Sequence, residues 1–149
     1  MEIERKFLIN EIPFPLDSFK KRTIEQAYLC TEPVVRVRRD SDSYYLTYKG
    51  RGLIAREEYN LPLTKESYAH LLSKADGRII QKDRYEIPLP DGHLIELDLF
   101  TGELSGLILA EIEFDSVEEA MNYPVPDWFG EDVSNSPKYQ NSTLSIRKE

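Results

Sequence analysis

The sequence contains very little cysteine and histidine, which narrows the chemistry open to it. Cys30 is the only cysteine, so an internal disulfide framework is excluded. The two histidines, His70 and His93, lie far apart and lack the spacing of metal ligands. No apolar run approaches the roughly 20 residues of a membrane span, and the first residues lack a signal-peptide core. We therefore expect a cytoplasmic protein with no membrane partner.

An excess of positive charge is also absent. The chain has 19 basic and 27 acidic residues, giving a formal net charge of −8. This charge argues against nucleic acid or an anionic membrane surface as the main partner, although it allows a local basic pocket. The length of 149 residues suits one ordinary domain, so residues 1–149 are predicted to fold as a single domain.

A repeated alternation of apolar and charged residues dominates the sequence, and this pattern is typical of β-strands with two different faces. The predicted strands are 2–9, 24–31, 34–40, 44–49, 55–63, 79–89, 93–100 and 107–114. Capping residues predict helices at 64–75 and 116–123, with further helical turns at 17–22 and 141–147. The fold class is therefore α+β, mainly β, built as an eight-stranded antiparallel β-barrel or tunnel with a few short helices packed outside.

The charged residues form stripes on one parity of most strands. Glu2, Glu4 and Lys6 share a face, for example, while Ile3 and Phe7 lie opposite. In one interpretation the charged parity faces water around an apolar interior, giving a structural barrel. In the other, the apolar parity packs outward and the charged parity lines the lumen. The lumen would then hold Glu2, Glu4, Glu96, Asp98, Glu111, Glu113, Lys6, Arg36, Arg38, Lys49, Lys82 and Arg84.

A lumen of this composition favours a particular ligand chemistry. Two carboxylates 4 Å apart repel by about 4 kcal/mol at an effective dielectric constant of 20, so clustered acids need protons, bases or a metal cation. A set of oxygen ligands without Cys or His suits Mg²⁺ or Mn²⁺. Arginine and lysine side chains around such a cation are what a polyphosphate requires.

Several motifs resemble those of the CYTH superfamily, the triphosphate tunnel metalloenzymes. The opening Glu2-Ile3-Glu4-Arg5-Lys6 is similar to its ExExK signature. Further matches occur in family order along nearly the whole chain. They are Gln26-Ala27-Tyr28-Leu29, Val35-Arg36-Val37-Arg38-Arg39, Thr47-Tyr48-Lys49-Gly50, Arg56-Glu57-Glu58-Tyr59, Lys82-Asp83-Arg84-Tyr85, Glu96-Leu97-Asp98, Ala110-Glu111-Ile112-Glu113-Phe114 and Trp128-Phe129-Gly130-Glu131-Asp132-Val133.

The resemblance implies roles for individual residues. Metal ligands would be Glu2, Glu4, Glu111 and Glu113, with Glu96 or Asp98 assisting. Substrate-binding residues would be Lys6, Arg36, Arg38, Lys49, Arg56, Glu58, Lys82, Arg84 and Lys138. Lys6 and Tyr28 would form the catalytic pair. Asn60 departs from the family pattern, because many members carry an acid there.

The function implied by this resemblance is metal-dependent hydrolysis of a triphosphate, with inorganic triphosphate as the favoured substrate. Adenylate cyclase, thiamine triphosphatase and a non-catalytic polyphosphate- or nucleotide-binding module are the alternatives. Trp128 is a candidate aromatic platform for thiamine, although packing beside Pro126 is the favoured role. The expected cofactor is Mg²⁺ or Mn²⁺, and a homodimer is left open.

Overall fold

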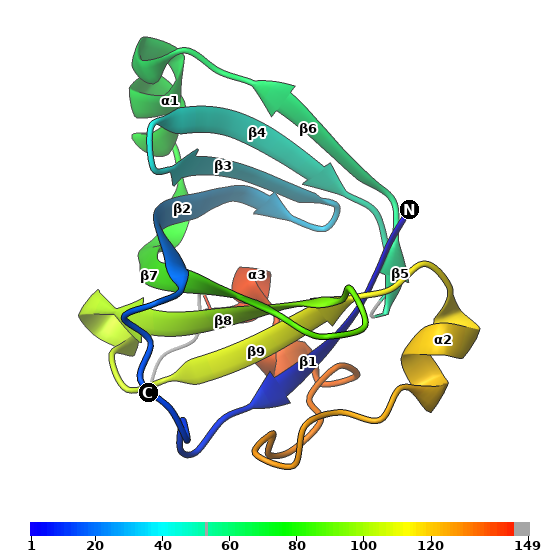
Figure 1. The fold of residues 1–149 in the computed structure, drawn as a ribbon. Helices are drawn as coiled ribbons and strands as arrows, with labels where there is room; N and C mark the ends of the chain where they lie inside the picture. Colours follow the sequence, from blue (N-terminus) through cyan, green and yellow to red (C-terminus); the bar gives the residue numbers. More distant parts are fainter. Residues whose placement is uncertain (53, 145–149) are drawn as a thin grey trace.

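Antiparallel strands form one strongly curved sheet in the computed structural model, which describes residues 1–52 and 54–144 (Figure 1). The sheet has the order β5-β1-β9-β8-β7-β2-β3-β4-β6, and every neighbouring pair is antiparallel. The strands are β1 (Glu2–Leu8), β2 (Lys20–Thr31), β3 (Val34–Asp40), β4 (Ser43–Lys49), β5 (Ala55–Arg56), β6 (Glu58–Pro62), β7 (Asp76–Pro88), β8 (Leu94–Thr101) and β9 (Ile108–Glu113).

The predicted strand 55–63 is present in two pieces, and this interruption nearly closes the barrel. β5 pairs with β1, placing Arg56 opposite Glu2, whereas β6 pairs with β4, placing Glu58 opposite Lys49. One chain segment therefore bridges the two ends of the sheet by changing neighbour at Glu57. The preceding loop is tight: a Cβ at Gly52, whose φ is +128°, would lie 2.2 Å from the Ala55 carbonyl oxygen, so glycine is required there.

β2 begins earlier than predicted, and the helical turn expected at 17–22 is wrong. The backbone from Lys20 onward pairs with β7, where Lys20 lies opposite Glu86. Ion pairs of Glu86 with Lys20 (3.6 Å) and Arg22 (3.3 Å) accompany this pairing. The long-range pairing outweighs the weak local helical tendency, and it brings Arg22 into the barrel wall.

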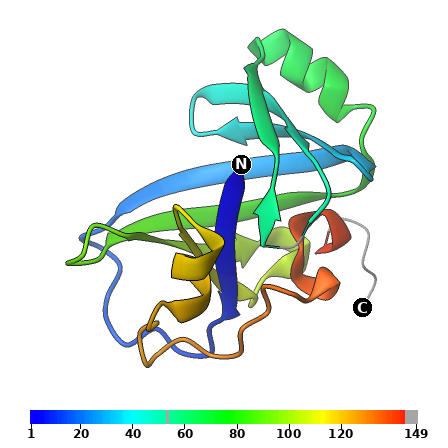
Figure 2. The same ribbon diagram turned by 90° about the vertical axis from the view of Figure 1, so that its right-hand side faces the viewer.

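Short helices lie on the outside of the barrel, with α1 (Lys65–Leu72) and α2 (Val117–Asn122) far apart (Figures 1 and 2). Thr64 and Ser116 cap them by accepting hydrogen bonds from the backbone N–H groups of Ser67 and Glu119. α3 (Asn141–Leu144) confirms part of the predicted 141–147 segment, and 145–147 lie outside the described residues. Single 3₁₀ turns occupy η1 (Gly102–Leu104) and η2 (Pro137–Tyr139). No helix in the described ranges is long and apolar enough to cross a membrane.

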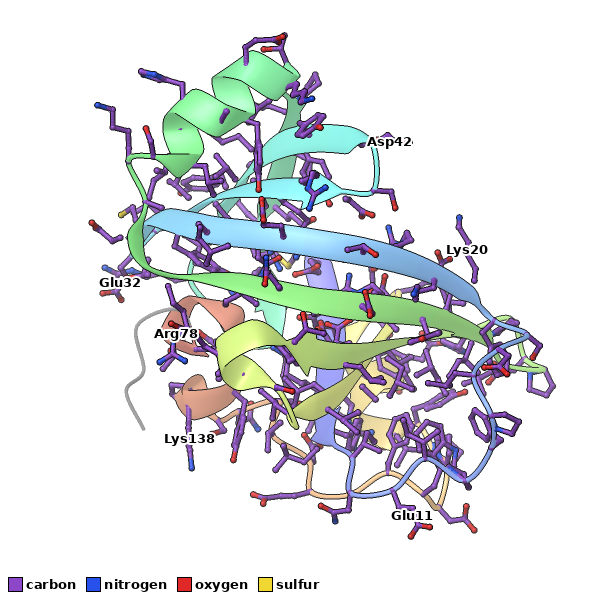
Figure 3. All side chains as sticks on the ribbon, turned by 90° about the vertical axis from the view of Figure 1, so that its left-hand side faces the viewer. Glu11, Lys20, Glu32, Asp42, Arg78 and Lys138 are labelled. Carbon is purple, nitrogen blue, oxygen red and sulfur yellow. The ribbon has the colours of Figure 1, made fainter. Side chains whose placement is uncertain are left out.

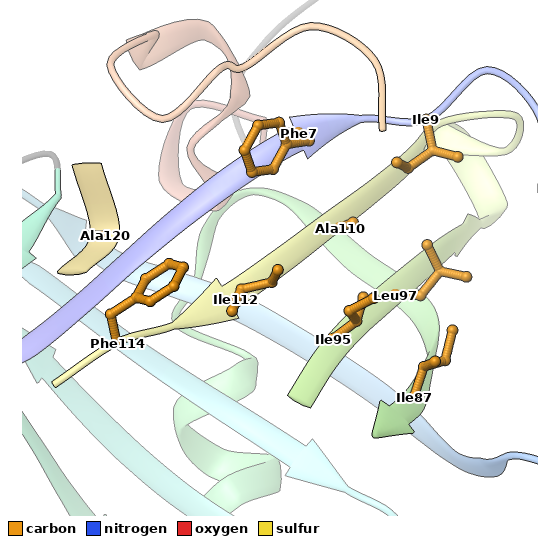
Figure 4. Packing of buried hydrophobic residues seen from close by; sticks show 9 residues of the cluster. All are labelled: Phe7, Ile9, Ile87, Ile95, Leu97, Ala110, Ile112, Phe114 and Ala120. Atoms are coloured by element: carbon orange, nitrogen blue, oxygen red, sulfur yellow. The ribbon is translucent and has the colours of Figure 1, made fainter. Parts of the chain in front are cut away.

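The larger apolar core lies on the outer surface of β1, β7, β8 and β9, under the segments that surround α2 (Figure 4). Its strand residues alternate with the charged residues: Phe7 follows Lys6, and Ile112 lies between Glu111 and Glu113. Trp128 joins this core by packing edge-on against Phe14, with ring centroids 5.4 Å apart. The structural-barrel interpretation, with an apolar interior, is therefore wrong.

Candidate functional site

The tunnel holds a cavity of about 220 Å³ whose walls are mostly charged. Six acidic residues line it: Glu2, Glu4, Glu58, Glu96, Glu111 and Glu113. Seven basic residues line it: Lys6, Arg22, Arg36, Arg38, Lys49, Arg56 and Arg84. Tyr28, Tyr45, Ser134 and Gln140 add polar groups. The cavity thus brings together most of the residues that the sequence predicts for the site.

Three predicted site residues do not line the cavity. Lys82 and Asp98 are fully buried and pair with each other, with 2.7 Å between Nζ and Oδ2. Lys138 is exposed on the outside of the molecule, where its ammonium lies 5.3 Å from the ring centroid of Tyr139 (Figure 3).

Four of the polar lining residues were missed by the sequence analysis: Arg22, Tyr45, Ser134 and Gln140. Arg22 shares the parity of Gln26 and Tyr28, but the alternation weakens upstream of residue 24, and only the pairing with β7 places it in a strand. Ser134 comes from the irregular C-terminal segment, where its hydroxyl accepts a hydrogen bond from the Lys6 backbone N–H at 2.8 Å. No periodicity marks that segment, so only the tertiary structure reveals this contact.

Two arginines of β3, Arg36 and Arg38, are held by neutral groups, whereas Arg22 on the neighbouring β2 pairs with Asp40 at 2.7 Å. Arg38 donates to the Gln26 amide oxygen at 2.7 Å and to the Tyr45 hydroxyl at 3.3 Å. Arg36 donates to the Thr47 hydroxyl at 3.2 Å. Within residues 1–52 and 54–144, neither guanidinium forms an ion pair with a carboxylate. Burial lowers the pKa of Arg38, and the neighbouring charges of Arg36 and Arg84 lower it further.

The opposite wall, from β7, β8 and β9, holds its cations with carboxylates. Arg84 forms a two-pronged contact with Asp98, at 2.7 and 2.9 Å, and also reaches Glu96 (3.3 Å) and Glu111 (3.5 Å). Burial would lower the pKa of Arg84, but Asp98 and the other carboxylates outweigh it and raise this pKa well above its ordinary value. Burial lowers the pKa of Lys82 to about 7, against the opposing charge of Asp98.

The carboxyl groups of the tunnel contact one another in two pairs, Glu4 with Glu111 and Glu2 with Glu58. Burial raises the pKa of Glu4 well above its ordinary value, and Glu111 raises it further. Burial likewise raises the pKa of Glu2 to about 7, with a contribution from its hydrogen bond to Glu58. Lys49 lies 2.7 Å from Glu2 and 3.4 Å from Glu58. In each pair the environment thus favours a proton on one carboxyl group, Glu4 or Glu2, while it lowers the pKa of the partner, Glu111 or Glu58.

The donor set fits a hard divalent metal, although the described side chains do not form a complete metal cage. In the part of the chain that the structure describes, no three Asp, Glu, His or Cys side chains group closely enough to hold a metal ion by themselves. Mg²⁺ commonly binds through one or two carboxylates, with waters and substrate phosphates completing its octahedron. Paired carboxylates facing unpaired arginines provide that kind of partial site.

The fold and the cavity define the class of protein: a β-tunnel whose carboxylate-rich wall faces Arg36 and Arg38, two buried arginines without an ion pair among the described residues. The CYTH domain model matches residues 1–133, and the chain belongs to this family.

Similar proteins include two named inorganic triphosphatases. One, from Nitrosomonas europaea, is 38% identical over 148 residues, covering 97% of each chain. The other, from Acetivibrio thermocellus, is 36% identical over 151 residues, covering 96% of this chain and 92% of the relative. A crystal structure of an inorganic triphosphatase superposes with a TM-score of 0.74 at 35% identity, covering 99% of this chain and 96% of that one.

Proposed function

We propose that this protein is an inorganic triphosphatase, which hydrolyses inorganic triphosphate to pyrophosphate and orthophosphate. The observation that carries the proposal is the pair of buried arginines, Arg36 and Arg38, that no described carboxylate neutralises. A buried, uncompensated cation pair is costly unless an anion completes it. The two curated relatives, which carry the name inorganic triphosphatase over nearly the full chain, support the same substrate.

The substrate is proposed to lie along the arginine wall. Arg36 and Arg38 offer donors without an ion pair among the described residues, and guanidinium groups suit phosphate oxygens because of their planar geometry. Lys6, whose charge also acts on Glu111, adds a third cation beside them. Lys49, Arg84 and Arg56 add positive charge from the carboxylate side, and Glu58 orients Lys49. Lys82 acts through its field, since its ammonium is engaged by Asp98. The role of Lys138 stays a prediction.

Mg²⁺ or Mn²⁺ is proposed as the cofactor, held by Glu2, Glu4, Glu111 and Glu113. When bound, the metal supplies Lewis-acid charge that polarises the phosphate oxygens. Glu96 lies near this group but is engaged by Arg22 (3.2 Å) and Arg84 (3.3 Å). Asp98 accepts three charge-assisted hydrogen bonds from Lys82 and Arg84, which leaves it better suited to orienting those cations than to binding metal.

Hydrolysis requires water to attack the terminal phosphorus while the bridging P–O bond breaks and pyrophosphate leaves. Arg36 and Arg38 stabilise the charge on the transferred phosphoryl group and the leaving group. Lys6 and Tyr28, which both line the cavity, orient the attacking water, whose proton passes to an oxygen of the transferred phosphoryl group. The Lys6 ammonium is held 3.1 Å from the Tyr139 carbonyl oxygen, which fixes the side chain beside the cavity.

The alternatives lack a supporting contact. Thiamine recognition would require an aromatic platform near one tunnel mouth, and the candidate for it, Trp128, instead packs in the outer core against Phe14 and Phe129. Adenylate cyclase activity would form a cyclic nucleotide from ATP, and a non-catalytic binding module would release no phosphate. Residues 1–149 are proposed to form one domain. The cytoplasmic location and the homodimer stay predictions.

Phosphate release from inorganic triphosphate, ATP, GTP and thiamine triphosphate, each with Mg²⁺, Mn²⁺ or chelator, tests the function. We expect metal-dependent release with inorganic triphosphate preferred. The double variant Glu111→Gln/Glu113→Gln should lose at least about 100-fold in kcat, because it removes charge from the metal site, while circular dichroism shows a folded protein. Normal turnover in that variant, or cyclic nucleotide formation from ATP, would refute the proposal.

A further inference from the structure

Arg36 is held in the tunnel wall by an uncharged partner. Its side chain is buried, with the residue 4% exposed, and Nη2 donates to the Thr47 hydroxyl at 3.2 Å. Its Nε finds no hydrogen-bond partner in the described structure. Thr47 lies directly opposite on β4 and is fully buried. One face of the guanidinium is thus fixed, and donor capacity remains on the other.

The Thr47 hydroxyl is itself oriented by Asn60. Asn60 lies opposite Thr47 on β6, and its amide oxygen accepts the hydroxyl proton at 2.5 Å. This hydrogen bond directs the remaining lone pairs of the hydroxyl toward Arg36. The Asn60 amide nitrogen donates to Glu58 at 2.9 Å. A continuous series of hydrogen bonds therefore crosses three strands from Arg36 to Glu58.

An amide is the group that suits position 60 in this series. It accepts from Thr47 on one side and donates to Glu58 on the other, which a carboxylate cannot do. An aspartate of the same shape would face Glu58 as a like charge and would add negative charge near Arg36. The neutral series fixes the arginine, and along it two uncharged side chains separate Arg36 from Glu58.

Arg84 shows the opposite arrangement. Asp98 fixes it with two short contacts, and the charge of Arg84 is cancelled in the process. A hydroxyl held by an amide supplies the same restraint on geometry without the opposing charge. The choice between a carboxylate and a neutral hydroxyl matters for an arginine whose positive charge binds an anionic ligand in the tunnel.

We infer that Thr47 and Asn60 are positioning residues that orient the Arg36 guanidinium for an anionic phosphate ligand while leaving its charge uncancelled. The inference rests on the proposed function, because it assigns Arg36 to the triphosphate. Neither residue lines the cavity, so each acts through Arg36 and not by touching the substrate.

The test compares steady-state kinetics of inorganic triphosphate hydrolysis at saturating Mg²⁺. Thr47→Val keeps the shape and removes the hydroxyl, so KM should rise about five- to tenfold with kcat within about twofold. Thr47→Ser restores the hydroxyl and should return KM to within about twofold of the original. Thr23→Val, the same change on the exposed face of β2, serves as the matched control and should leave both constants unchanged.

Asn60→Asp provides a second variant at an exposed position, so it tests the inference even if Thr47→Val does not fold. We expect a KM increase at least as large as that of Thr47→Val, since charge is added as well as a hydrogen bond lost. Increasing ionic strength should shrink the difference from the parent protein. An unchanged KM in Asn60→Asp would overturn the inference.

A double-variant cycle with Arg36→Gln separates this inference from the proposed function. If Thr47 acts only through Arg36, Thr47→Val should change KM by less than about twofold in the Arg36→Gln background. An unaltered KM in Thr47→Val, with a large increase in Arg36→Gln, removes the positioning role and leaves the triphosphatase standing. An unaltered KM in Arg36→Gln itself removes Arg36 from the proposed substrate site.

Discussion

The two walls of the tunnel use the same kinds of cation for different purposes. On the β7–β8–β9 wall, Arg84 and Lys82 are neutralised by Asp98, and the group behaves as a buried ionic network. On the β2–β3–β4 wall, Arg36 and Arg38 are held by a threonine hydroxyl, an amide and a phenol. The side chains that contact an arginine, and not the residue type itself, therefore decide its role. Arginines paired with carboxylates stabilise the barrel, and arginines held by neutral groups are available to bind an anion.

Removing Asp98 should have the largest effect on stability, because it takes the carboxylate from buried Lys82 and removes the two shortest contacts of Arg84. We expect Asp98→Asn to lower the free energy of unfolding by about 3 to 5 kcal/mol, measured by urea denaturation. Asp83→Asn on the outer face of the adjacent strand, where the carboxylate meets the Thr23 hydroxyl, is the control and should change stability by less than about 0.5 kcal/mol. A small effect of Asp98→Asn would mean that the two walls do not differ as described.

Removing Arg38 should have the opposite effects: a large rise in KM and little change in the free energy of unfolding. Arg38→Gln should raise KM for inorganic triphosphate by about 10- to 100-fold, the loss of one or two charged hydrogen bonds. The free energy of unfolding should stay equal or rise, because the repulsion from Arg36 and Arg84 is relieved. A destabilised variant with an unchanged KM would mean that Arg38, like Arg84, stabilises the fold and does not bind the substrate.

A surface cluster outside the tunnel should have the smallest effect and provides a reference for both walls. Asp91 accepts from the Tyr123 hydroxyl at 2.6 Å and lies 3.0 Å from His93 Nδ1. Hydrogen bonds from Tyr123 and the His93 backbone lower the pKa of Asp91 to about 2, and the hydrogen bond to Asp91 raises the pKa of His93.

The raised His93 pKa means that the stabilisation is present below the unfolded pKa of about 6.5 and is lost as the pH rises through the folded value. The lowered Asp91 pKa means that its share is present above about pH 4 and is lost as the pH falls toward 2. His93→Gln should therefore lower Tm most between about pH 4 and 6.5, by about 2 °C or less. A constant difference in Tm across the whole pH range would contradict this assignment.

Strand periodicity predicted most of the barrel, but it could not predict that one segment changes its partner strand partway along. Residues 55–63 read as one strand, and the chain splits it so that Arg56 pairs with Glu2 while Glu58 pairs with Lys49. The segment at 17–22 lacks an alternation strong enough to identify a strand, and its pairing with β7 is a long-range effect. Arg22 was missed for that reason alone.

The sequence by itself determined the alternation that gives each strand a charged and an apolar face, because side chains of successive strand residues point in opposite directions. It did not determine which face was enclosed. The alternation of Glu4 and Phe7 is the same whether the apolar side chains or the charged side chains point into the barrel. Only the tertiary structure decided how the charges are matched: Asp98 lies beside Lys82 and Arg84, whereas Arg36 donates to the Thr47 hydroxyl, which donates in turn to Asn60. Pairing across strands depends on register and barrel closure, and both are set by contacts between residues far apart in the chain.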